Sequence, residues 1–92
     1  MRGTEKVAGY RVAIYDNGGK TADRYTVCLV DCPETGGCVE ALCLSELEGS
    51  MWDYMGISCF DMAARGPHLG RRIPFASLSP YMQKHIVNRL SA

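Results

Sequence analysis

The sequence predicts a small α+β domain, in which an antiparallel meander of three to four strands packs against a C-terminal helix and a short middle helix. Glycine-containing turns separate runs of tyrosine, valine and other strand-forming residues. The last residues carry apolar side chains at helical spacing. A chain of 92 residues with 47% hydrophobic content supports one core. We therefore expect a single domain over residues 1–92.

The first predicted strand runs from about residue 7 to 15. Val12 and Ile14 alternate there with their neighbours, as expected when a strand buries one face. The Asn-Gly-Gly sequence at 17–19 tolerates the positive φ angles that a tight turn between twisted strands requires. This strand and the next are therefore expected to form an antiparallel hairpin.

The second predicted strand, at 24–31, is apolar on both faces, which is typical of a central strand. A Pro-Glu-Thr-Gly-Gly turn follows within residues 32–37. The third predicted strand occupies 38–44 and completes the meander.

Beyond residue 44 the pattern is weaker. Large amphipathic side chains at 51–55 fit either a core that covers the sheet or an exposed contact surface, and burial is the better interpretation in so small a domain. A short helix is expected at 59–65, because Ser58 could act as its N-cap with Asp61 three residues later, and Gly66-Pro67 could end it.

Residues 68–75 predict an extended connection that adds an edge strand. The clearest helix follows, with Ser79 as its N-cap and Pro80 at its first position. Its apolar stripe, expected to pack on the sheet, consists of Met82, Ile86, Val87 and Leu90.

Ten basic and ten acidic side chains give a formal net charge of zero, so no field of the whole molecule attracts nucleic acid or an anionic membrane. No apolar run reaches the roughly 20 residues of a membrane span. The first residues do not resemble a signal peptide. We expect a cytoplasmic protein without membrane contact.

Four of the five cysteines lie close together in the sequence, so a zinc site must be considered. Their spacings, three, five and four intervening residues, lack the Cys-x2-Cys knuckle of most zinc sites. In a reducing cytoplasm, scattered free thiols are the better interpretation. No metal or other cofactor is expected, although a structural zinc held by Cys32, Cys38 and Cys43 stays open as an alternative.

No motif with fixed catalytic roles is present, so we expect no enzyme and no small-molecule substrate. The Gly-Lys-Thr sequence at 19–21 lacks the P-loop's earlier glycine, and a strand rather than a helix is expected after it. His68 and His85 lie beside basic residues and are expected to be surface groups.

A basic patch able to contact phosphate or an acidic protein surface would form if the hairpin and the C-terminal helix lay on one side of the domain. A solvated surface is the simpler interpretation of the same charges. The residues concerned are Asn17, Lys20, Arg24, Arg71, Arg72, Lys84 and Arg89.

One block of the sequence, at 16–27, reads DNGGKTADRYTV. A second block begins at 68–73 with HLGRRI and continues with Leu78-Ser-Pro and Gln83-Lys84. Together the two blocks resemble a family of small proteins encoded by bacteriophages and other mobile elements. The sequence departs from the family pattern at 47–55.

The small size of the chain, and the phage origin and host bacterial cytoplasm that this resemblance implies, are similar to those of the anti-CRISPR proteins, and of type I-F inhibitors in particular. The resemblance implies binding to the multi-subunit CRISPR-Cas ribonucleoprotein, at its protein backbone subunits or its DNA-entry surface, with or without contact to its guide RNA, which blocks target DNA hybridisation. The residues then expected to contact the partner are Asn17, Lys20, Arg24, Asp31, Glu34, Arg71 and Arg72.

Two other classes of function stay open. A phage accessory protein that binds nucleic acid directly predicts salt-sensitive affinity for free DNA or RNA. A zinc-stabilised structural module predicts bound metal and unfolding by a chelator.

Overall fold

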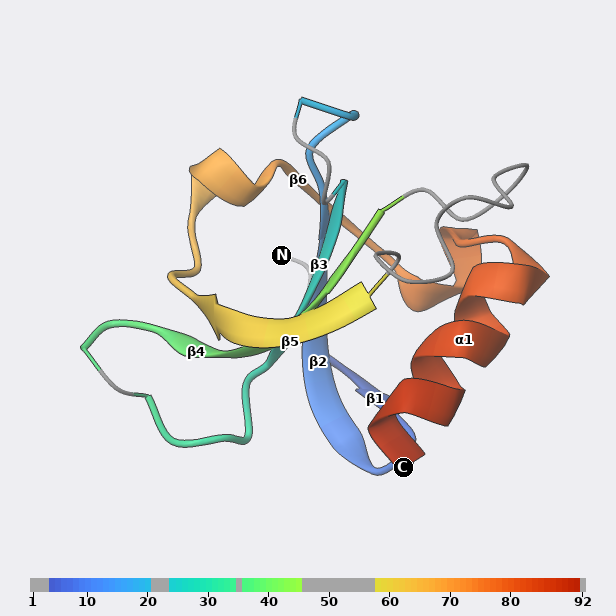
Figure 1. Ribbon diagram of the computed structural model, residues 1–92, viewed down its shortest axis with the longest axis horizontal. Coiled ribbons are helices and arrows are strands. Elements are labelled where there is room, and N and C mark those ends of the chain that lie inside the picture. The colour runs from blue at the N-terminus through green and yellow to red at the C-terminus, as the bar shows by residue number, and fades with distance from the viewer. Residues whose placement is uncertain (1–3, 21–23, 35, 46–57, 92) are drawn as a thin grey trace.

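The computed structural model describes residues 4–20, 24–34, 36–45 and 58–91. Within these ranges an antiparallel sheet of six strands packs against one α-helix, which confirms a mixed α+β fold (Figure 1). The predicted features at 47–55 lie outside the described residues. The strands are β1 (Glu5–Val7), β2 (Tyr10–Asp16), β3 (Tyr25–Leu29), β4 (Val39–Leu44), β5 (Ser58–Ala63) and β6 (Arg71–Ile73), and the helix is α1 (Pro80–Ser91).

The strands are ordered β1-β2-β3-β4-β5, so the predicted meander forms the middle of the sheet. β3 is buried along its whole length between β2 and β4, as its two apolar faces predict. β6 pairs with β2 on the side that β1 also occupies. β1 lies beside residues 10–12 and β6 beside residues 14–16.

The main core lies between the sheet and α1. One face of the sheet, including Val12, Ile14 and Val27, packs against Met82, Ile86 and Leu90 on one stripe of the helix, as the sequence predicts. Each such buried side chain stabilises the fold by about 1.5–3 kcal/mol relative to exposure. Val87, which was expected in the same stripe, is instead 37% exposed, because it lies to one side of the face that meets the sheet. Ser79 begins the helix as expected, since its Oγ accepts a hydrogen bond from the Met82 amide at 3.2 Å.

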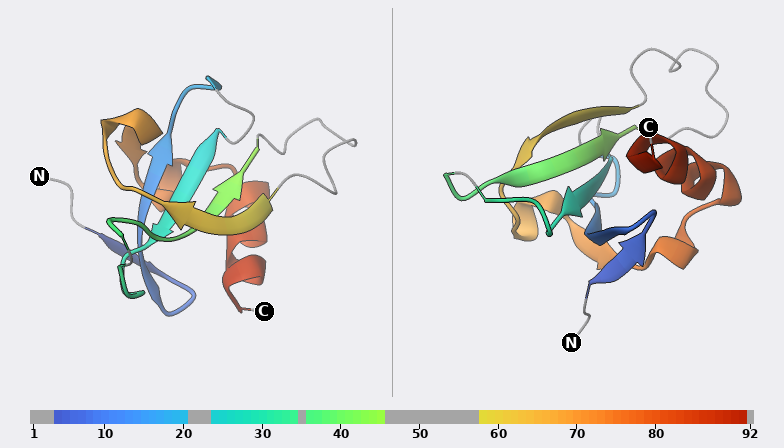
Figure 2. Two further views of the ribbon diagram at one scale, coloured as in Figure 1. Left: turned by 60° about the vertical axis from the view of Figure 1, so that its left-hand side comes forward. Right: turned by 90° about the horizontal axis from the view of Figure 1, so that it is seen from below.

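The opposite face of the sheet carries a smaller apolar cluster that includes Ala13, Tyr15, Cys28 and Ala41. Leu69 packs against this cluster from the connection between β5 and β6, which contains a short 3-10 helix, Pro67–Leu69. The two further views show this connection and α1 on different sides of the sheet (Figure 2). No helix in the described part of the chain is long and apolar enough to cross a membrane.

Two expectations are wrong. The segment 59–65, expected to be a helix, lies largely in strand β5, where Phe60 and Met62 alternate with Asp61. Asp61 lies within this strand and caps no helix. Its Oδ1 accepts a hydrogen bond from the adjacent Met62 amide at 2.8 Å. The sheet accordingly has more than the expected three to four strands.

The predicted first strand is in fact two. A turn at Ala8 and Gly9, with φ angles of 52° and 86°, divides it into β1 and β2. Two successive positive φ angles are typical of the tight turn that joins paired antiparallel strands.

Candidate functional site

The turn after β2 is organised by two side chains of the first sequence block. The Asn17 Oδ1 accepts hydrogen bonds from the backbone amides of Gly19 at 2.8 Å and Lys20 at 3.1 Å. The Asp16 Oδ1 accepts one from the Gly18 amide at 2.8 Å. These local bonds replace backbone partners that a turn lacks. Asn17, which was expected to contact a partner, therefore has a role in shaping the turn.

Arg24 closes this turn from its other end. Its Nε donates to the Asp16 Oδ1 at 2.8 Å and its Nη2 to Oδ2 at 3.2 Å, in a two-point ion pair. The Asp16 side chain is only 10% exposed and that of Arg24 is 29% exposed. The guanidinium also lies 5.1 Å from the centre of the Tyr25 ring. Arg24 is thus held in a fixed orientation.

The second sequence block lies directly against this turn. Asp16 pairs with Arg71 across β2 and β6, and Tyr15 pairs with Arg72. Gly70, at φ 100°, packs so closely that a Cβ atom there would lie 2.2 Å from the Asp16 carbonyl oxygen and 2.5 Å from the Asn17 Cα. Only glycine allows this approach of the two backbones.

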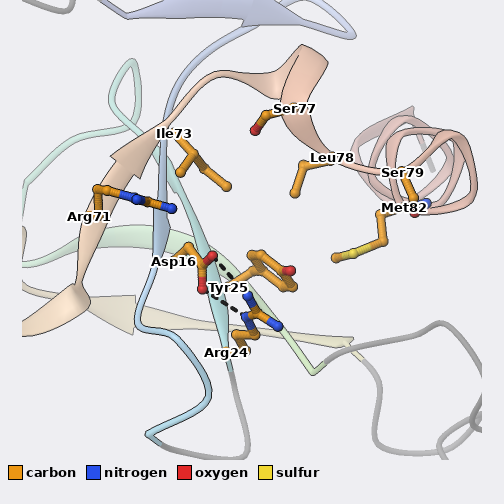
Figure 3. A pocket seen from close by; sticks show the side chains of 9 residues that line it. All are labelled: Asp16, Arg24, Tyr25, Arg71, Ile73, Ser77, Leu78, Ser79 and Met82. Carbon is orange, nitrogen blue, oxygen red and sulfur yellow. Dashed lines mark hydrogen bonds and ion pairs between the residues drawn. The ribbon is translucent and has the colours of Figure 1, made fainter.

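A pocket of about 420 Å³ opens where these segments meet the start of α1 (Figure 3). Its polar lining comes from Asp16, Arg24, Arg71, Ser77 and Ser79. Its apolar lining comes from Tyr25, Ile73, Leu78 and Met82, all of them largely buried in the main core. All but Ser77 and Met82 belong to the two sequence blocks, which comprise residues 16–27 and residues 68–73, 78–80 and 83–84.

The charges in the pocket are organised around Asp16. The hydrogen bond from Arg24 is the main cause that lowers the pKa of this carboxyl; burial opposes it, and the Gly18 amide and the positive charge of Arg71 add to the lowering. Asp16 is therefore ionised at neutral pH and neutralises one arginine. Arg71, which is exposed, supplies the remaining positive charge of the lining.

The structure brings together Arg24 and Arg71 from the predicted contact residues, with Asn17 and Lys20 in the adjoining turn. It places the other three elsewhere. Asp31 lies beyond the opposite end of β3, where its Oδ1 is 3.7 Å from the Arg11 Nε. Glu34 is exposed in the connection that follows β3.

Arg72 lies on the other face of the sheet from this pocket. Its guanidinium is 5.4 Å from the centre of the Tyr15 ring, and the Tyr15 side chain belongs to the smaller apolar cluster. Arg65 donates to the Tyr15 hydroxyl at 3.5 Å, and this bond is the main cause that raises the pKa of Arg65. Neighbouring arginines of one strand thus serve two different surfaces, because side chains alternate along a strand.

Sequence reasoning missed Asp16 and Ser77 as part of the site. The opposite charges of Asp16 and Arg24, on the two sides of a predicted hairpin turn, were a usable signal for an ion pair. Ser77 had no such signal, because its place depends on the path from β6 to α1. Ser79 was predicted as a helix cap, and the structure adds that it faces the pocket.

A second pocket, of about 340 Å³, lies near the end of α1 and includes Tyr10, Glu40, Phe60 and Arg89 in its lining. The Arg89 guanidinium is 5.2 Å from the centre of the Phe60 ring. Lys84 and Arg89, which the sequence grouped with the basic hairpin, do not line the first pocket.

Four of the cysteines, Cys28, Cys32, Cys38 and Cys43, carry free thiols. The described segments contain no cluster of three or more His, Cys, Asp or Glu side chains that could hold a metal ion. Burial raises the pKa of the Cys28 thiol, which therefore stays protonated and is a poor nucleophile.

Comparison with family models, with curated proteins and with solved structures gives no match to this chain.

Proposed function

We propose that this protein is a non-catalytic binding domain that engages an anionic group of a macromolecular partner through the pocket at Arg24 and Arg71. The observation that carries the proposal is a concave surface that combines Arg24, fixed by its ion pair with Asp16, with the exposed Arg71. The described lining contains no His or Cys, and its only carboxylate is engaged by Arg24. These groups supply recognition by charge and shape rather than a nucleophile and a base.

The partner that we propose is a type I-F crRNA-guided surveillance complex, in line with the resemblance to phage-encoded proteins. Such a complex offers carboxylates on its protein subunits and phosphates on its guide RNA. A compact domain bound near the path of target DNA would prevent hybridisation by occupying space. The formal net charge of zero suits a protein surface with both signs better than free nucleic acid.

The acidic residues Asp31 and Glu34 could make a second contact with the partner. Asp31 and Glu34 lie near the end of β3 that is remote from the pocket, so a partner that touches both regions must extend along the domain. We propose that these carboxylates meet basic side chains that otherwise hold DNA phosphate.

The test is capture of an assembled type I-F complex from a host lysate by the tagged protein, followed by measurement of target-DNA binding by the captured complex. Arg71→Gln removes the exposed charge of the pocket, and Lys6→Gln removes another exposed charge, on β1, as a matched control. We expect stoichiometric capture with loss of DNA binding, weakened by Arg71→Gln and unchanged by Lys6→Gln.

Absence of capture would overturn the choice of partner. Salt-sensitive binding of the isolated protein to free DNA or RNA would instead support the accessory nucleic-acid-binding function. Capture that Arg71→Gln leaves unchanged would show that another surface makes the contact.

A further inference from the structure

The pocket places apolar side chains next to a positive charge. Its floor is formed by the apolar side chains of Ile73, Leu78 and Met82, which are exposed by only 8%, 6% and 3%. Figure 3 shows the Arg71 guanidinium on one side of this floor and Ser79, at the start of α1, on the other. A ligand that fills the pocket must therefore present an apolar group and a polar group close together.

The polar groups of the rim are mainly donors. The Ser77 hydroxyl already donates to the Pro74 carbonyl at 2.7 Å. The Ser79 Oγ accepts from the Met82 amide, so its own proton remains for another acceptor. Within the described residues the Arg71 side chain has no hydrogen-bond partner. The start of α1 adds the positive end of a helix dipole.

The net charge of the described lining residues matches a ligand with one negative charge. Asp16 and Arg24 neutralise each other, and Arg71 leaves a single positive charge among the described lining residues. A nucleic-acid backbone carries several negative charges and strongly hydrated sugars. Placing such groups against an apolar floor would cost desolvation free energy. Asp and Glu side chains bring one charge but little apolar surface.

We infer that the pocket binds the C-terminal residue of a partner protein when that residue is apolar. Such a chain end carries a carboxylate and an aliphatic or aromatic side chain on the same carbon atom. The carboxylate is held by Arg71, and the side chain occupies the floor between Arg71 and Ser79. A pocket of about 420 Å³ lies in the range of sites that enclose small groups. This inference rests on the proposed function, since it names the group that the pocket face would recognise on a partner.

The test uses the isolated protein, labelled with ¹⁵N, and small probes that separate the two properties. N-acetylleucine has both the carboxylate and the apolar side chain, N-acetylleucinamide lacks the charge, and acetate lacks the side chain. We expect N-acetylleucine to shift the amide signals of Arg71, Ile73 and Ser79 with a dissociation constant on the order of 1 mM. The amide and acetate should bind at least about tenfold more weakly.

Variants assign the signals to the pocket. Arg71→Gln should weaken binding of N-acetylleucine at least about tenfold, because it removes a charge-assisted hydrogen bond to the carboxylate. Lys6→Gln, which removes an exposed charge outside the pocket, should leave the affinity unchanged. Both substitutions are at exposed positions, so we expect each variant to fold like the unmodified protein. The same spectra verify this.

Three results would overturn the inference: no shift at the pocket, equal binding of N-acetylleucinamide, or tighter binding of inorganic phosphate or uridine monophosphate to the same residues. The last result would assign the pocket to a phosphate group. Because no surveillance complex is present, this test can succeed when capture of the complex fails. Conversely, capture can succeed through another group while these probes fail.

Discussion

Replacement of Gly70 by alanine tests whether the two sequence blocks are held together as the structure shows. Gly70 has φ 100° and ψ −155°, a combination that is essentially restricted to glycine and costs another residue about 1–3 kcal/mol. The added Cβ would lie 2.2 Å from the Asp16 carbonyl oxygen and 2.6 Å from its carbonyl carbon. Backbone atoms cannot turn away as a side chain does, so β6 must move from β2.

The size of the effect follows from two terms. Forced displacement of packed atoms adds about 1–3 kcal/mol to the conformational cost, which gives a loss of about 2–6 kcal/mol in the free energy of unfolding. A domain of this length has about 5–14 kcal/mol in total. We expect Gly70→Ala to lower Tm by at least about 10 °C.

The assay is urea unfolding followed by far-ultraviolet circular dichroism, with Gly37→Ala as the matched control. Gly37 also has a positive φ, of 81°, but an added Cβ would meet no atom within 4 Å. Its substitution should cost only about 1–2 kcal/mol from backbone conformation. If Gly70→Ala were no more destabilising than Gly37→Ala, the close approach of β6 to the turn would be refuted.

Three further predictions concern charge, packing and reactivity. Asp16→Asn should lower the free energy of unfolding at pH 7 by about 1–3 kcal/mol, because it leaves the partly buried Arg24 without its ionic partner. The pKa of Asp16 is lower in the folded than in the unfolded protein, so its stabilising contribution is present at neutral pH and is lost as pH falls through the folded-state value. Urea titrations of both proteins from pH 7 to pH 2 should therefore converge in acid, and a difference that persists there would contradict this origin. Ile86→Ala should cost about 2–5 kcal/mol because Ile86 is fully buried under the sheet, whereas Val87→Ala, at a position 37% exposed, should cost much less; equal losses in urea unfolding would argue against the orientation of α1. Iodoacetamide should alkylate Cys32 and Cys38 well before Cys28 in the folded protein, as peptide mass spectrometry would reveal, because Cys28 is buried and its thiol pKa is raised; early labelling of Cys28 would show that this face of the sheet is open.

The elements that the sequence predicted well have a periodic pattern and local end signals. The central strand was recognisable because both of its faces are apolar, and α1 because Ser79 precedes a helical stripe that ends at Leu90. In these segments the local preference and the final packing agree.

Errors arose where a local signal had two meanings. Ser58 and Asp61 have the spacing of a helix cap, but Phe60 and Met62 also have the alternation of a strand, and pairing with β4 selects the strand. The turn at Ala8 was hidden because alanine rarely adopts a positive φ.

The candidate site was predictable only in part, because its geometry depends on one pairing between distant segments. The charges of Arg24 and Arg71 were evident from the sequence, but their approach requires β6 to pair with β2 rather than with another edge. The same pairing sends Arg72 to the opposite face, and the path of β3 removes Asp31 from the pocket. No local preference encodes these outcomes.

Gly70 and Arg71 are adjacent in the sequence but are expected to have different roles, one in stability and the other in binding. Gly70 makes the close backbone approach that places β6, so its substitution should reduce stability and disturb the pocket together. Arg71 is exposed and has no hydrogen bond to satisfy within the described residues, so its substitution should leave the free energy of unfolding nearly unchanged. A stable Arg71→Gln protein that has lost its ligand would identify a contact residue, because a merely structural residue cannot lose binding without losing stability. If Arg71→Gln instead unfolded as easily as Gly70→Ala, the arginine would be a part of the fold, and the pocket would lose its principal recognition group.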